Sequence, residues 1–75
     1  MKPNRENDYL KALGANIRKM RKAKSLTMEE LANTAEIEYR QLGRIERGEI
    51  NTSVLSLLRL ADSLEIELYL LFVFS

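Results

Sequence analysis

The sequence predicts an all-α fold: a compact bundle of four to five short helices in a single domain over residues 1–75. Three observations predict it. Apolar residues recur at spacings of three and four, as they do along one face of a helix. Residues that cap helices precede several of these runs. Only three Gly and one Pro occur in the chain, too few for a loop-rich scaffold.

The first helix is predicted to begin near residues 6–9 and to end near Lys24, with acidic residues early and basic residues late, as the helix dipole favours. Gly14 lies inside it and should weaken it slightly. We expect residues 1–8 to be mobile and the packed core to span residues 9–72. The apolar face of this helix consists of Leu10, Leu13, Ile17 and Met20.

Two short helices follow. Thr27 and Glu30 have the spacing of a capping box, which predicts a second helix from Met28 to about Thr34. After a brief connection, a third helix is predicted from about Tyr39 to Arg47, and Gly48 is placed to end it. Leu42 and Ile45 should face the core.

A fourth helix is predicted after Asn51, Thr52 and Ser53, which can supply capping oxygens. Its apolar face is predicted to consist of Leu55, Leu58, Ala61 and Leu64. The last segment, residues 66–74, fits two interpretations. Its apolar residues alternate as in a strand, but Leu68, Leu71 and Phe72 also share one helical face, and we narrowly favour a helix.

The composition excludes several classes of function. The chain has no Cys and no His, which removes thiol chemistry, the usual general base and the commonest metal ligands. We therefore expect no enzyme activity, no metal and no cofactor. The longest apolar run, residues 68–74, is far shorter than the ~20 residues of a spanning helix, and the polar N-terminus does not resemble a secretory signal. We expect a cytoplasmic protein with no membrane partner.

The charges are unevenly distributed. Eleven of the twelve Lys and Arg residues lie in residues 1–48, which carry a net charge of +4, whereas the remainder carries −3. Such basic runs are commonly solvated helix faces. The asymmetry nevertheless indicates a polyanionic partner on one side of the molecule. The densest basic stretch consists of Arg18, Lys19, Arg21, Lys22 and Lys24.

Four strings carry a family resemblance: IRKMR at residues 17–21, LTMEELA at 26–32, RIERG at 44–48 and NTSVLSLLRLADSL at 51–64. In this order and spacing, residues 13–74 resemble the phage-repressor (Cro/repressor, Xre-type) helix-turn-helix DNA-binding family. The resemblance implies a lambda-repressor-like fold whose helix 39–47 enters the major groove of double-stranded DNA. It also implies a homodimeric transcriptional regulator in a bacterial-type cytoplasm, at the nucleoid.

Helix 39–47 is predicted to expose a stripe opposite Leu42 and Ile45, formed by Arg40, Gly43, Arg44 and Arg47. Arg pairs bidentately with guanine, and Tyr can contact a thymine methyl or a phosphate. The candidates for base reading are Tyr39, Arg40, Gly43 and Arg44. Phosphate contacts are expected from helix N-termini and from cations. Their candidates are Thr27, Met28, Gln41, Arg47, Asn51, Thr52, Lys22 and Lys24.

Arg21 and Glu46 match a pair that joins the first and third helices in the family by a salt bridge, so we expect a structural role for both. Other positions depart from the family pattern. Met28 replaces a common Gln, which leaves only its backbone amide for phosphate. Glu36 replaces the Gly of the turn, where a left-handed backbone strains other residues. Glu38 replaces a capping Ser or Thr, and Gly43 should loosen the third helix.

Nearly every residue from 68 to 74 is apolar, and one short segment cannot bury all of them in so small a core. We therefore expect a two-fold homodimer, joined as paired helices or as an antiparallel ribbon. Its contact residues are Leu68, Tyr69, Leu70, Phe72 and Phe74. Two alternatives stay open: a protein-interaction module that has lost DNA binding, which the low net charge, Glu36 and Glu38 favour, and an antitoxin with a toxin as its protein partner.

Overall fold

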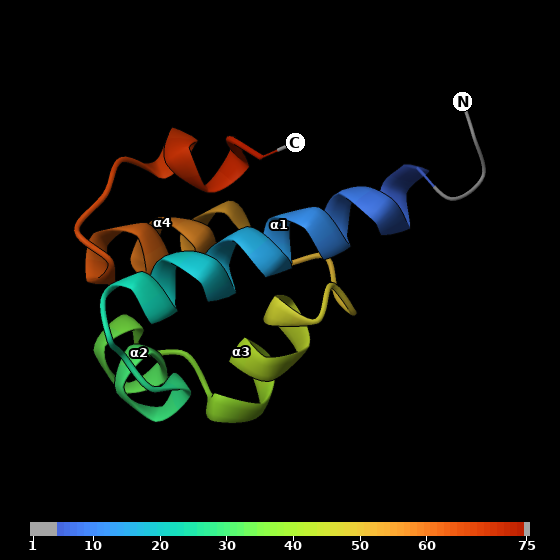
Figure 1. Cartoon of the computed structure of the whole chain (residues 1–75). Helices are drawn as coiled ribbons and strands as arrows, with labels where there is room; N and C mark the ends of the chain where they lie inside the picture. The colour runs from blue at the N-terminus through green and yellow to red at the C-terminus, as the bar shows by residue number, and fades with distance from the viewer. Residues whose placement is uncertain (1–4, 75) are drawn as a thin grey trace.

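The computed structural model describes residues 5–74 and confirms the all-α fold. The elements are α1 (Arg5–Ala23), α2 (Met28–Ala35), α3 (Tyr39–Glu46), α4 (Val54–Ser63) and a 3-10 helix, η1 (Leu68–Phe72). Helix α1 crosses the molecule, with α2 and α3 below it and η1 above it in the view of Figure 1. Of the segment expected to be mobile, residues 1–4 lie outside the described residues, and residues 5–8 begin α1.

The helix starts largely follow the predicted capping signals. The Thr27 hydroxyl accepts a hydrogen bond from the Glu30 amide at 3.0 Å, and the Glu30 carboxylate accepts one from the Thr27 amide at 2.9 Å. Ser53 caps α4 by accepting from the Ser56 amide at 3.1 Å. Glu38 stands at the N-cap of α3 but makes no capping hydrogen bond with its side chain. Helix α3 therefore depends on packing more than α2 and α4 do.

Three of the helices are followed by a non-glycine residue in the left-handed region. Ser25 follows α1, Glu36 follows α2 and Glu65 follows α4, with φ values of 58°, 56° and 59°. The left-handed backbone expected at Glu36 is therefore confirmed. This conformation allows the Ile37 amide to donate to the Ala32 carbonyl at 2.9 Å, which closes the end of α2 and directs the chain into α3.

The core lies between α1, α2, α3, α4 and η1. Its fully buried large side chains are Ile17, Leu31, Leu42, Leu60, Leu64 and Leu71. The predicted inner face of α4 is wrong at two positions, because Leu55 is 64% exposed and Leu58 is 40% exposed. The stripe of Leu57, Leu60, Ala61 and Leu64 packs inward instead. Helix α4 carries two overlapping apolar stripes, and contact with α2 and η1 selects this one.

Gly14 lies where α1 crosses α3. A Cβ atom at this position would overlap the carbonyl oxygen of Ile45 and lie 2.6 Å from that of Glu46. The interpretation of Gly14 as a minor weakness in the helix was therefore incomplete. Because the residue has no side chain, the backbones of α1 and α3 can approach closely.

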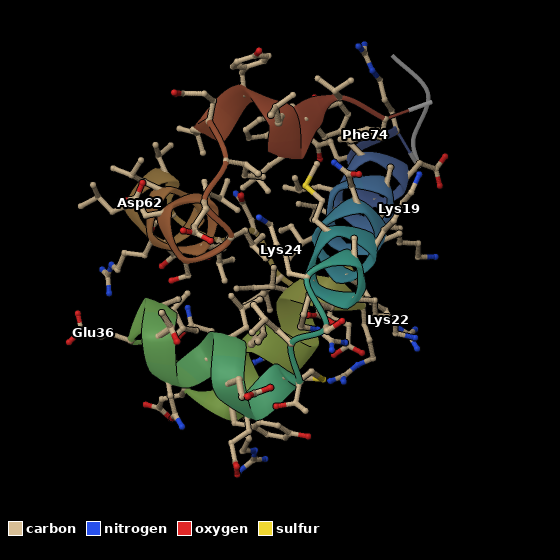
Figure 2. The ribbon with its side chains drawn as sticks, turned by 60° about the vertical axis from the view of Figure 1, so that its left-hand side comes forward. Lys19, Lys22, Lys24, Glu36, Asp62 and Phe74 are labelled. Carbon is tan, nitrogen blue, oxygen red and sulfur yellow. The ribbon has the colours of Figure 1, made fainter. Side chains whose placement is uncertain are left out.

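The C-terminal segment is helical, as favoured, and the strand interpretation is wrong. Leu71 is fully buried beneath η1. The buried amide of Asn16 donates to the carbonyls of Leu70 at 3.1 Å and Leu71 at 2.8 Å, which fixes η1 to α1. The rings of Tyr9 and Phe74 meet edge to face with their centroids 5.1 Å apart. Phe74 accordingly lies over α1 in Figure 2.

Candidate nucleic-acid interface

A buried ion pair fixes α3 to α1. Arg21 donates from Nε and Nη2 to the two carboxylate oxygens of Glu46, at 2.8 and 3.1 Å. Its Nη1 also donates to the Leu26 carbonyl at 2.9 Å, so the pair reaches the connection between α1 and α2. The predicted salt bridge between these helices is present. Both partners are buried, which makes this bond part of the scaffold of the site.

Helix α3 presents polar side chains on the face opposite its buried Leu42 and Ile45. Tyr39 is 57% exposed, and Arg40 and Arg44 are also exposed. These three predicted base readers line one groove together with residues from the start of α2 and the end of α3. The groove is lined by Met28, Tyr39, Arg40, Gly43, Arg44, Arg47 and Glu49.

Gly43 does not belong to an exposed stripe, and the sequence interpretation is wrong on this point. The residue is buried, because Met28 from α2 and Arg47, the C-cap of α3, cover it. A Cβ atom there would lie 3.0 Å from Arg47 Nη1 and 3.3 Å from Met28 Cε. Gly43 therefore lies at the floor of the groove. Its part in base reading stays a prediction.

A carboxylate lies among the arginines at the end of α3. Arg47 donates from Nε to Glu49 Oε2 at 2.6 Å and from Nη2 to Oε1 at 3.4 Å. Arg44 Nε is 3.9 Å from the same carboxylate. The hydrogen bond from Arg47 lowers the pKa of Glu49; desolvation opposes this, and the charges of Arg47 and Arg44 lower it further. Glu49 is therefore ionised at neutral pH.

The predicted phosphate contacts fall in different places. Met28 and Arg47 lie in the groove with the base-reading candidates. Gln41 is half-buried, and Asn51 is exposed beyond the end of α3. The Thr27 hydroxyl is engaged in the capping box. The Thr52 hydroxyl is buried and finds no hydrogen-bond partner within the part of the chain that the structure describes.

The two lysine candidates are separated. Lys22 is exposed on α1 and lines a hollow with Lys19 and Glu46. Figure 2 shows Lys19 and Lys22 on the same side of α1. Lys24 Nζ lies instead 3.9 Å from Glu65, which follows α4. The structure therefore places Lys24 beside an acid and not among the groove residues.

Two residues of this surface are absent from the predicted contacts, although Arg18 belongs to the basic stretch of the first helix. Arg18 lines a second hollow with Met28, Gly43 and Arg47, so α1 contributes a cation beside the groove. Its spacing of four from Lys22 places both on one helical face, which could have indicated it. Glu49 is the other, and its position directly after the glycine that ends α3 was the available signal.

The candidate dimer residues are exposed to different degrees. Tyr69 is 65% exposed and Phe72 is 38% exposed, whereas Leu68 and Phe74 are half-buried against the core. Leu70 is also half-buried. Val73, 61% exposed, extends this C-terminal apolar surface. A second group of exposed apolar side chains, not predicted, lies on the outer side of α4. It consists of Val54, Leu55 and Leu58.

None of the helices within residues 5–74 combines the length and the apolar character needed to cross a lipid bilayer.

Comparison with known proteins agrees with this geometry. The helix-turn-helix family HTH_3 matches residues 17–71. The uncharacterized HTH-type transcriptional regulator y4dJ of Sinorhizobium fredii (strain NBRC 101917 / NGR234) is 35% identical over 57 residues, which cover 76% of this chain and 74% of that protein.

Solved structures agree as well. The restriction-modification controller protein C.AhdI from Aeromonas hydrophila superposes with a TM-score of 0.83 at 38% identity, over 84% of this chain and 96% of that one. A hypothetical transcription factor from Neisseria, NHTF, gives a TM-score of 0.84 at 26% identity, over 92% of this chain and 79% of that one. The family match covers more than half of the chain and confirms the predicted resemblance. This chain therefore belongs to the HTH_3, Xre-type helix-turn-helix family of DNA-binding transcriptional regulators, which are not enzymes.

Proposed function

We propose that this chain is a homodimeric transcriptional regulator that recognises a specific sequence in double-stranded DNA by placing α3 in the major groove. The observation that carries the proposal is the exposure of Tyr39, Arg40 and Arg44 on one face of a helix whose other face is fixed. The Arg21–Glu46 bond and the close approach at Gly14 hold that helix against α1. Fixed exposed side chains can discriminate between bases, because direct readout depends on geometry.

The chemistry of the exposed face suits base edges. The Arg40 and Arg44 guanidinium groups can each donate two parallel hydrogen bonds to O6 and N7 of guanine. Tyr39 is the first residue of α3. In this docking geometry, the N-terminal residues of the recognition helix contact the base edges. We assign base reading to these three side chains, with Gly43 at the floor of the groove that they line.

Contacts with phosphate would fix the register of α3 on the duplex. The start of α2 offers the backbone amide of Met28 beside the Thr27 cap, whose own amide donates to Glu30, and Asn51 and Thr52 stand just before α4. Gln41, Arg47 and Lys22 are the side-chain donors that we assign here. We assign Lys24 only to long-range attraction, because Glu65 is its neighbour.

We further propose that two copies join through the C-terminal apolar surface formed by Tyr69, Phe72 and Val73, with Leu68, Leu70 and Phe74 at its base. A two-fold axis there would present two α3 helices to successive major grooves about 34 Å apart. Such a regulator would act in the cytoplasm, at the nucleoid. The comparisons favour neither the interaction-module alternative nor a toxin partner.

Selection from a library of random duplexes tests this function directly. The purified protein should enrich an inverted repeat whose half-sites are centred about one helical turn apart. Its affinity for the enriched duplex should exceed that for mixed-sequence DNA by at least about 10³-fold. Enrichment of no sequence, with equal affinity for all duplexes, would contradict sequence-specific binding.

A further inference from the structure

We propose that Glu49 competes with DNA phosphate for Arg47 within the same molecule and thereby sets how tightly this protein binds DNA. The inference rests on the DNA-binding mode proposed above. Glu49 is a negatively charged residue on a surface whose neighbouring side chains, Arg44 and Arg47, are positively charged.

The backbone fixes the position of Glu49. Gly48 adopts a left-handed φ of 71°, and its amide donates to the Ile45 carbonyl at 3.0 Å. The Glu49 amide then donates to the Arg44 carbonyl at 2.9 Å, which returns the chain toward α3. A Cβ atom on residue 48 would lie 2.5 Å from Lys11 Cα, so this turn requires glycine. Glu49 is consequently held beside the outer face of α3.

The bond that Glu49 makes is the bond that a phosphate would make. Two oxygens of its carboxylate face Nε and Nη2 of Arg47, in the forked arrangement by which arginine also binds phosphate. A DNA phosphate therefore has to displace Glu49 before Arg47 can contact it. The side chains of both residues are about half exposed, so the exchange can occur, but it reduces the net gain from the new contact.

The other acids near the groove are placed differently. Within residues 5–74 the arginine ion pairs involve Glu46, which is buried in the scaffold, and Glu49. Glu30 is engaged in the capping box. Glu38 is exposed at the start of α3, and no ion pair or side-chain hydrogen bond is found for it in this part of the chain. Glu38→Gln is therefore a matched control, since it removes the same charge next to the opposite end of α3 without releasing an arginine.

The experiment measures binding of the full chain to a labelled mixed-sequence duplex over a series of KCl concentrations. We expect Glu49→Gln to tighten binding about threefold to tenfold at low salt, and to steepen the plot of log K against log salt by about one unit. Glu38→Gln should leave the slope unchanged. The double variant Arg47→Gln, Glu49→Gln should return the slope to the wild-type value. Thermal melting should show equal folding of all four proteins.

Two results would overturn the inference. Equal changes of slope for Glu49→Gln and Glu38→Gln would show that only the total charge matters. A steeper slope that persists in the double variant would show that Arg47 is not the residue released. A wild type that binds no duplex even at low salt would instead contradict DNA binding itself, and this inference with it.

Discussion

Arg44 and Lys22 are both exposed cations, but they lie on different elements and should contribute to DNA binding in different ways. If Arg44 contacts guanine, Arg44→Ala should cost about 1–3 kcal/mol and relax the base preference at one position of the site. Lys22→Ala should weaken binding to all sequences alike and lower the salt slope by about one unit. Binding to a panel of singly mutated duplexes measures both. If both variants lost the same affinity for every duplex of the panel, the assignment of base reading to α3 would be wrong.

Glu36 holds a left-handed backbone that glycine adopts without steric cost. Glu36→Gly should therefore stabilise the fold by about 1 kcal/mol, the difference between the strain removed and the added freedom of the unfolded chain. Urea denaturation measures the free energy of unfolding. Glu38→Gly is the control, because it removes the same charge at a φ of −62°, where no strain is relieved. A loss of stability in Glu36→Gly would show that the glutamate side chain makes a compensating contact.

At the scale of the elements, α4 shows which of two apolar stripes carries the packing. Leu60 is fully buried, whereas Leu58 is 40% exposed. We expect Leu60→Ala to lower the free energy of unfolding by about 2–5 kcal/mol, through lost burial and the cavity left behind. Leu58→Ala should cost roughly 1 kcal/mol or less, because the side chain is already partly in water. Thermal or urea denaturation of both variants makes the comparison, and equal losses would show that the stripe is misassigned.

The features that sequence predicted well depend on residues close together in the chain. The capping box at Thr27 follows from local backbone chemistry, which a short string specifies. The left-handed backbone at Glu36 could be expected only from the family resemblance, in which that turn carries Gly. The Arg21–Glu46 salt bridge could be predicted only from the family resemblance, since 25 residues separate the partners in the sequence. Helix starts, helix ends and the order of elements could therefore be predicted.

The features that sequence did not predict depend on which elements meet. Gly14 is required because α3 crosses α1 at that turn, and no local signal shows the crossing. Asn16 is buried because η1 returns 54 residues later to present two carbonyls to it. Gly43 is covered by a side chain of α2. In the candidate site, the exposed face of α3 could be predicted from periodicity, whereas its floor could not.

At the scale of the whole molecule, we predict that two chains associate as a dimer in solution. The chain has a mass of 8.7 kDa, and light scattering should give twice this value for the wild type. Tyr69→Glu with Val73→Glu should give the single mass, because both side chains are exposed on the C-terminal apolar surface and the charges would oppose its pairing. These positions are better suited than Leu70 or Phe74, which are half-buried and whose substitution would also disturb the fold.

Val54→Glu with Leu55→Glu is the matched control, since it places two charges on the other exposed apolar group, on α4. This variant should stay dimeric. Dissociation of the α4 variant alone would move the interface to α4. A wild type that stays monomeric at high micromolar concentration would end the dimer proposal.

The hydrogen bonds of Asn16 have a consequence for the kind of DNA site that such a dimer accepts. One face of α1 holds α3, and Asn16 on the same helix holds η1 through the Leu70 and Leu71 carbonyls. In a dimer joined through η1, no flexible linker separates the two recognition helices, because each is connected to the joint by a single rigid helix. One extra base pair between half-sites moves them about 3.4 Å apart and rotates one against the other by roughly a tenth of a turn. A protein built in this way distinguishes operators by the number of base pairs between their halves, independently of the letters in either half.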